Sequence, residues 1–191
     1  MNNVRATVIE LLGQLGSSRE ARQYLNQFSR VDQARFAVVK VGGAVLRDDI
    51  DALASALAFL HQLGLTPIVL HGAGPQLDEA MREAGLAVEK HDGLRVTTEA
   101  VMAVVRPIIY EANTRLIDAL DARGVKARGV LHGVFKSHLA DPDNLGLVGE
   151  VDEVVLEPLS AAIRAGALPV LACLGESHSG QMMNINADMA A

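Results

Sequence analysis

Aromatic residues and cysteine are scarce in this sequence. Trp is absent, Phe, Trp and Tyr together make up 3% of the 191 residues, and Cys173 is the single cysteine. A core without aromatic side chains has to be built from aliphatic ones, and 50% of the residues are hydrophobic. Because one cysteine cannot close a disulfide within the chain, and Cys173 lies in an apolar stretch, we expect it to be buried in a protein of the reducing cytoplasm.

Long apolar runs and basic clusters are also missing. No apolar run approaches the ~20 residues that span a bilayer, and no signal-type hydrophobic stretch follows the first basic residues, so we expect no membrane insertion. The 17 Lys and Arg residues are outnumbered by 23 Asp and Glu residues, which gives a formal charge of −6. We therefore expect no nucleic-acid partner, and an anionic ligand has to be held by local features. The six histidines lack the spacing of a metal site, so we expect no metal bound by protein side chains.

The hydrophobic pattern divides the chain at about residue 34. Apolar residues at helical spacing predict a helical extension in residues 1–34, ahead of a domain that covers residues 35–191. Within the domain, short apolar runs alternate with helical patterns, as in a parallel sheet covered by helices. The length is sufficient for one α/β domain with a substantial core.

Two of these apolar runs end in glycine turns. The run that begins at Phe36 ends in Lys40-Val41-Gly42-Gly43, and a second run, residues 67–70, ends in His71-Gly72-Ala73-Gly74. Pro75 then opens a helix, so free amide groups and the positive end of the helix dipole face the second turn. Each turn could be a bare tight turn, but together they lie at the carboxyl ends of predicted parallel strands, where open α/β sheets bind ligands.

Several other elements follow from the apolar pattern. A helix is expected over residues 48–63, and residues 86–97 are too polar and too short for another, so they form an irregular or hairpin segment. Thr97 or Thr98 is suited to cap the helix that follows.

The end of the chain predicts one strand over residues 168–174 and then the start of a helix over residues 182–188. Three residues are left to build that helix, and an isolated helix so short is not stable. We therefore expect that the sequence stops within a fold whose second half lies beyond it.

Lys40 ends an otherwise apolar strand. An uncompensated ammonium group is costly there, and the glycines that follow let the backbone approach a ligand, which favours an anionic partner. The alternative is that the side chain reaches solvent from the strand end.

Arg95 and three polar residues near the end of the chain are further candidates. Arg95 precedes a helix start, where its guanidinium could bind a substrate carboxylate through two hydrogen bonds, although a surface salt bridge is the commoner role. Asn184, Asn186 and Asp188 stand before the last predicted helix. Capping explains at least one of them, but it does not require all three.

Four motifs follow one another over residues 35–191: Lys40-Val41-Gly42-Gly43, His71-Gly72-Ala73-Gly74-Pro75-Gln76, Gly93-Leu94-Arg95-Val96-Thr97 and Met183-Asn184-Ile185-Asn186-Ala187-Asp188. Each motif is weak alone, but the ordered set is specific and resembles the N-acetylglutamate kinases of the amino-acid kinase family. The residues around His71 and the N-terminal extension are most similar to kinases fused with, or related to, acetylglutamate synthase.

The resemblance implies an α/β fold, an open three-layer αβα sandwich with a mainly parallel sheet, truncated after its N-terminal acyl-glutamate-binding half. It implies an acetylglutamate kinase of arginine biosynthesis that phosphorylates the side-chain carboxylate of N-acetyl-L-glutamate. ATP is the implied donor, with Mg²⁺ held by the nucleotide phosphates rather than by a protein cage. Only the substrate-binding part of the kinase domain is expected in residues 35–191.

By the same resemblance Lys40 and Asp188 are catalytic. Lys40 would stabilise charge on the transferring phosphoryl group, and Asp188 would orient Lys40. The amide of Gly43 would bind phosphate oxygens.

The implied substrate-binding residues are Ala73, Gly74, Arg95 and Asn184, with the last two on the acylated amino acid. Ala73 stands where many family members have glycine. This departure is tolerated if the φ angle of Ala73 is negative and counts against the interpretation if it is positive.

Two other functions stay open. A non-catalytic, arginine-sensing domain of an acetylglutamate synthase, or of a bifunctional synthase and kinase, would share the fold, but such domains generally lack the strand-end lysine and the final aspartate. A relative acting on another small acid or on carbamate is disfavoured by Gly93-Leu94-Arg95-Val96-Thr97. Residues 1–34 resemble an extension that interlaces subunits of arginine-inhibited members, so a homo-oligomer inhibited by L-arginine is expected. Docking of that segment on its own domain fits equally well.

Overall fold

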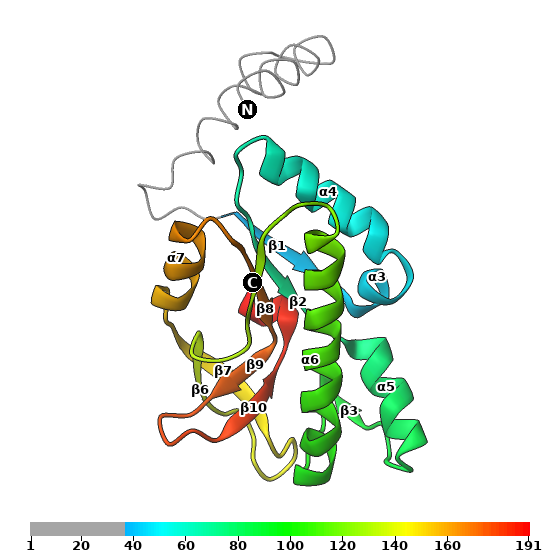
Figure 1. The fold of residues 1–191 in the computed structure, drawn as a ribbon. Coiled ribbons are helices and arrows are strands. Elements are labelled where there is room, and N and C mark those ends of the chain that lie inside the picture. Colours follow the sequence, from blue (N-terminus) through cyan, green and yellow to red (C-terminus); the bar gives the residue numbers. More distant parts are fainter. Residues whose placement is uncertain (1–36) are drawn as a thin grey trace.

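The computed structural model describes residues 37–191. The predicted helical extension, residues 1–34, lies outside the described residues. The described residues form layers of helices around a central sheet, with a second four-stranded sheet beside it (Figure 1).

A parallel sheet of four strands forms the centre of the fold. Its order is β1-β2-β8-β5, and every neighbouring pair is parallel. The strands are β1 (Val38–Val41), β2 (Ile68–His71), β8 (Leu168–Ala172) and β5 (Ala127–Val130). The first two pair residue for residue, from Val38 opposite Ile68 to Val41 opposite His71. The loops that follow β1 and β2 therefore begin side by side.

Helices cover both faces of this sheet because its strands alternate apolar side chains between them. Val69 and Val170 pack with the helices of one face, whereas their neighbours Leu70 and Leu171 pack with Leu159 of the other. The first face carries α4 (Ile50–Gln62), α5 (Gly74–Glu83) and α6 (Glu99–Asp121), with α3 (Gly43–Asp48) beside α4 and α5. The second face carries α7 (Glu157–Arg164) and the end of α8 (Ala187–Ala190). The expectation of an αβα sandwich with a mainly parallel sheet is confirmed.

The second sheet was not expected from the sequence. It consists of β6 (Phe135–Leu139), β7 (Val148–Val154), β9 (Leu174–Glu176) and β10 (Met182–Ile185). Each strand pairs with the next in the order β10-β7-β6-β9, and β9 pairs back with β10, so the sheet closes on itself.

Two sequence predictions at the end of the chain are wrong in detail. The single strand over residues 168–174 is divided, because the chain leaves the parallel sheet after Ala172 and enters the second sheet at Leu174. Residues 182–185 form β10, and α8 begins only at Ala187. Met183 and Ile185 are buried, while Met182 and Asn184 are half-buried, so burial alternates as in a strand. In so short a segment, the apolar pattern of the sequence does not distinguish a strand from a helix.

The predicted helix over residues 48–63 also has different bounds. A short helix, α3, begins at Gly43, and α4 follows from Ile50. Asp49 separates them, with φ −132° and ψ 28°, outside the helical region. Gly43 is therefore the first residue of a helix as well as part of the loop after β1.

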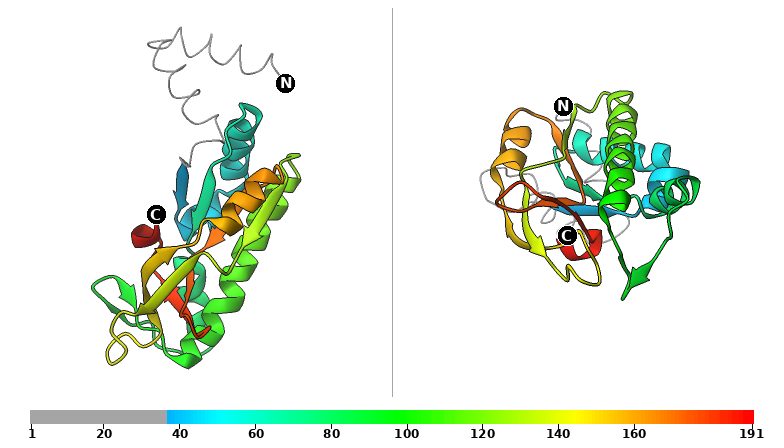
Figure 2. Two further views of the ribbon diagram at one scale, coloured as in Figure 1. Left: turned by 90° about the vertical axis from the view of Figure 1, so that its left-hand side faces the viewer. Right: turned by 90° about the horizontal axis from the view of Figure 1, so that it is seen from below.

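Residues 86–97 contain a hairpin, as the sequence allowed. Strands β3 (Lys90–His91) and β4 (Leu94–Arg95) pair antiparallel and stand away from the main body (Figure 2). Asp92 and Gly93 between them have φ angles of 50° and 82°, which suits a two-residue turn with positive φ at both positions. The Thr98 side chain accepts a hydrogen bond from the Val101 amide at 3.2 Å, so the predicted cap of α6 is confirmed.

A buried polar cluster joins β2, β8 and α6. His71 is fully buried, and its Nε2 lies 2.9 Å from Asn113 Nδ2, which also donates to the Val170 carbonyl at 3.1 Å. The Cys173 thiol donates to the His71 carbonyl at 2.9 Å. Burial lowers the pKa of His71 to about 4 and raises the pKa of Cys173 to about 12, so both groups are neutral at pH 7.

Replacement of His71 by Gln is expected to reduce the pH dependence of stability. The pKa of His71 falls from 6.5 in an unfolded chain to about 4 in the fold, so between these values the unfolded state binds a proton that the native state excludes. The free energy of unfolding therefore falls as the pH is lowered through this window, by up to about 1.4 kcal/mol per pH unit. Urea unfolding at pH 7.5 and at pH 4.5 measures the decrease in the free energy of unfolding between these pH values. This decrease should be smaller in His71→Gln than in the unaltered protein. An equal decrease in both proteins would contradict the assignment of this pH dependence to His71.

Candidate functional site

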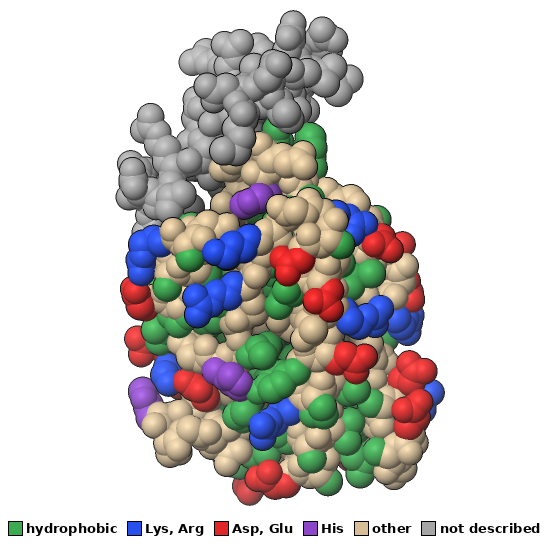
Figure 3. Space-filling model, in the orientation of Figure 1, with side chains coloured by type: hydrophobic (Ala, Val, Ile, Leu, Met, Phe, Trp, Pro, Cys, Tyr) green, Lys and Arg blue, Asp and Glu red, His purple; other side chains and the backbone are tan. Residues whose placement is uncertain are grey.

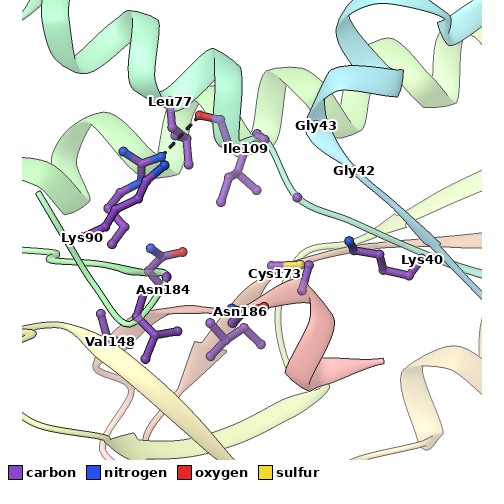
Figure 4. Close-up of a pocket in the computed structure, with 18 of the residues that line it drawn as sticks. Lys40, Gly42, Gly43, Leu77, Lys90, Ile109, Val148, Cys173, Asn184 and Asn186 are labelled. Carbon is purple, nitrogen blue, oxygen red and sulfur yellow. Dashed lines mark hydrogen bonds between the residues drawn. The ribbon is translucent and has the colours of Figure 1, made fainter. Parts of the chain in front are cut away.

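The candidate site is a cavity at the carboxyl ends of β1 and β2. It has a volume of about 230 Å³ and is lined by the loops after both strands, the β3–β4 hairpin and the segment that joins β10 to α8. Lys40 and Lys90 lie on opposite sides of it (Figure 4). The predicted site residues Lys40, Gly43, Ala73, Gly74, Arg95 and Asn184 all line this cavity.

The cavity concentrates positive charge in an acidic protein. Lys40, Lys90 and Arg95 line it, and no Asp or Glu of the described residues does. On the face shown in Figure 3, acidic and basic side chains are interspersed. The positive charge is therefore a local property of the cavity, which suits an anionic ligand.

Lys40 is paired with Asp188. Lys40 Nζ lies 2.6 Å from Asp188 Oδ1, and the two side chains are 34% and 74% exposed. An ion pair this exposed contributes about 0–1 kcal/mol to stability, so its main effect is to orient Lys40 at the cavity wall. Asn186 caps α8 by accepting from the Asp188 amide at 2.8 Å, which fixes the start of the helix that carries Asp188.

The two glycine loops touch each other. A Cβ atom on Gly43 would lie 2.8 Å from the Gly74 amide nitrogen and 2.9 Å from the Ala73 carbonyl carbon, so only glycine fits. Ala73 has a φ of −136°, and an alanine is therefore tolerated there. Helix α5 begins at Gly74 with Pro75 in its first turn, so amide groups free of helical partners face the cavity edge.

Arg95 is buried rather than on the surface, with its side chain 7% exposed. Its Nη2 pairs with Asp78 Oδ1 and donates to the Gly74 carbonyl at 3.3 Å, and its Nη1 contacts Met81 Sδ at 3.1 Å. Although burial opposes ionisation of Asp78, the hydrogen bond and charge of Arg95 hold the pKa of that carboxyl below its usual value. The guanidinium has five N–H donors, and Nε and one N–H of Nη1 make no hydrogen bond to the described residues.

Asn184 is tied to Arg95 through Thr97. Asn184 Nδ2 donates to Thr97 Oγ1 at 3.2 Å, and Thr97 Oγ1 donates to the Arg95 carbonyl at 2.8 Å. The cavity thus has two ends, with Lys40 and the loop after β1 at one and Arg95 with Asn184 at the other, and the loop after β2 reaches both, because Gly74 lies against Gly43 and also accepts from Arg95. Asn186 is the one member of the Asn/Asp cluster that capping explains.

Sequence reasoning assigned no role to Lys90, Asp78 or Gln76, although Gln76 ends the motif that begins at His71. Lys90 and Arg95 are direct partners across the β3–β4 hairpin, and both bind Asp78, with Lys90 Nζ 3.4 Å from Asp78 Oδ2. This shared carboxylate offsets the repulsion of two like charges on neighbouring strands. In the sequence Lys90 stands in a polar segment and Asp78 in a helix, and nothing separates them from ordinary surface residues.

The described part of the chain holds no group of three or more His, Cys, Asp and Glu side chains that could bind a metal ion. Among its helices, none has the length and apolar character that a membrane crossing needs.

Comparison with known proteins agrees with these features. A family model described as the amino acid kinase family matches residues 35–191. An acetylglutamate kinase from Xylella fastidiosa (strain 9a5c) is 54% identical over 177 residues, which are 93% of this chain and 42% of that protein. Protein ARG5,6, mitochondrial, from Candida albicans is 48% identical over 99% of this chain and 22% of that protein. The chain therefore spans less than half the length of these relatives.

A solved structure shares the fold. N-acetylglutamate synthase from Neisseria gonorrhoeae, in complex with coenzyme A and N-acetyl-glutamate, matches with a TM-score of 0.75 at 25% identity, over 91% of this chain and 40% of that one.

Removal of the Lys40 partner is expected to leave the fold intact. In Asp188→Asn the free energy of unfolding should change by less than about 1 kcal/mol, because the pair is exposed. Asp78→Ala is the comparison, since it leaves the buried Arg95 without its carboxylate, and here the loss should be larger, about 1–3 kcal/mol. Urea unfolding of both variants measures the difference. A loss in Asp188→Asn as large as that in Asp78→Ala would show that the Lys40 pair is structural.

Proposed function

The chain belongs to the amino acid kinase family, and from this premise we propose that it forms the acyl-glutamate-binding part of an N-acetylglutamate kinase. The proposed reaction transfers a phosphoryl group from ATP to the side-chain carboxylate of N-acetyl-L-glutamate, a step of arginine biosynthesis. The observation that carries the proposal is the Lys40–Asp188 pair at one end of a cavity whose other end holds Arg95.

The two ends of the cavity suit a substrate with two carboxylates. Arg95 and Asn184 offer N–H donors to the backbone carboxylate and the acylated amino group at one end. The reacting carboxylate then lies toward Lys40 and the glycine loops. The five-residue motif around Arg95 and the relatives' names support N-acetyl-L-glutamate over another small acid.

The residues at the Lys40 end fit a transferring phosphoryl group. The amides near Gly43 and Gly74 can donate to its oxygens, and the Lys40 ammonium offsets their negative charge. Mg²⁺ would accompany ATP, held by the nucleotide phosphates. When bound there, the ion neutralises phosphate charge.

The proposed step needs no protein base. A carboxylate oxygen of the substrate forms the new bond to the γ-phosphorus while the bond to the ADP oxygen breaks, and the ionised carboxylate has no proton to lose. His71 and Cys173 are both buried and neutral, with pKa values of about 4 and about 12, so neither is suited to proton transfer at pH 7. Catalysis would rest on positioning and charge stabilisation.

An arginine-sensing domain without kinase activity is the second candidate, because an N-acetylglutamate synthase is among the solved structures that share the fold. The Lys40–Asp188 pair favours the kinase, since domains that do not transfer phosphate generally lack both residues. Inhibition by L-arginine and assembly into a homo-oligomer are compatible with either function and stay predictions. The cytoplasmic location is also a prediction, because the Candida relative is named mitochondrial.

Calorimetric titration with N-acetyl-L-glutamate tests the assignment of Arg95. Arg95→Ala should weaken binding by at least about tenfold, because hydrogen bonds to a charged group contribute roughly 1.5–3 kcal/mol. Arg82→Ala, an exposed arginine of α5, is the matched control and should bind as the unaltered protein does.

No binding of N-acetyl-L-glutamate, with tight binding of L-arginine, would contradict the kinase and favour the sensing domain. Equal binding by Arg95→Ala and the unaltered protein would exclude the assigned role of Arg95.

A further inference from the structure

A side chain outside the cavity joins the two glycine loops. Gln76 lies in the first turn of α5, and its Nε2 donates to the Gly43 carbonyl at 2.8 Å. Gln76 does not line the cavity; it lines a separate hollow with Arg47, Glu79 and other residues of α3, α5 and α6. Gln76 therefore contacts the loop after β1 from outside the cavity.

The loops at this point are in close contact. The position of a Cβ on Gly43 is 2.8 Å from Gln76 Oε1 and equally close to the Gly74 amide nitrogen. Gly43 thus fits between the Gln76 side chain and the backbone after β2. A small displacement of this side chain would change the separation of the loops, because the contact leaves no space to absorb it.

Stability alone does not account for a glutamine at this position. Gln76 Oε1 is buried and accepts no hydrogen bond from any residue in the range 37–191 that the structure describes. A buried acceptor without a partner disfavours folding, and a Met or Leu side chain of similar size would fill the space without that cost. The function of the amide is then the bond that Nε2 makes to the Gly43 carbonyl.

We propose that Gln76 is a positioning residue for phosphoryl transfer, which holds the loop after β1 at a fixed distance from the loop that opens α5. The inference rests on the proposed kinase function for its chemistry. The two loops and Lys40 surround the place where the phosphoryl group would lie, and misplacement of such groups by about 1 Å can cost up to about a hundredfold in rate. Arg95 and Asn184 are held by Asp78 and Thr97 rather than by Gln76, so we expect substrate binding to depend little on Gln76.

Steady-state kinetics of the complete kinase test the proposal. Gln76→Met keeps the size of the side chain and removes the N–H donor, and it should lower kcat by about tenfold or more while KM for N-acetyl-L-glutamate changes less than about twofold. Gln76→Glu, which keeps the shape but cannot donate when ionised, should do the same and serves if Gln76→Met folds poorly. Glu79→Gln, an exposed neighbour on α5, is the control and should match the unaltered enzyme.

An unchanged kcat in both variants, or equal changes in kcat and KM, would overturn the proposal. Amide NMR of the present chain separates this failure from failure of the kinase function. In Gln76→Met the Gly43 and Gly74 amide resonances should both shift, and in Glu79→Gln neither should. If the unaltered protein has no kinase activity, the proposed function fails, and the absence of these shifts would also reject the link between the loops.

Discussion

The candidate site depends on the parallel, residue-for-residue pairing of β1 with β2. Because Val41 lies opposite His71, the two strands end at the same level and their glycine loops leave the sheet together. The close contact at Gly43 then sets the distance between the loops, and α5 starts from the second of them. Lys40 at the end of β1, the free amides of α5 and the hairpin after it all take their positions from this pairing.

Charge is arranged around the cavity in two layers. The lining carries Lys40, Lys90 and Arg95, while the carboxylates of Asp78 and Asp188 stand behind or beside them. The Asp78 pair, in which Arg95 is buried and Asp78 half-buried, fixes Arg95 and the hairpin, whereas the exposed Asp188 pair contributes little stability and leaves Lys40 at the edge of the cavity. Among the described residues, the lining presents donors and positive charge and contains no acidic group, which suits the proposed phosphoryl transfer to a carboxylate.

Much of the fold and of the site followed from the sequence, for identifiable reasons. Strands β1 and β2 were recognisable because continuous apolar runs stop at glycines, although β1 lies at the sheet edge and is largely exposed. The Thr98 cap and the hairpin were recognisable because turn and cap chemistry is local. The second sheet was missed because β9 and β10 are short, so their pattern does not separate strand from helix. Asp78, Lys90 and Gln76 were missed because their roles arise from contacts between elements, which no local pattern in one element carries. The roles of the predicted site residues themselves stay predictions.

The most direct test of the proposed reaction is phosphorus NMR of the complete protein with ATP, Mg²⁺ and N-acetyl-L-glutamate. The proposed function predicts an acyl-phosphate signal that grows with ADP in the unaltered protein and is lost in Lys40→Ala, while N-acetyl-L-glutamate still binds to that variant. Formation of acyl phosphate at an unchanged rate in Lys40→Ala would contradict the role of Lys40. Its absence from the unaltered protein would contradict the kinase function itself.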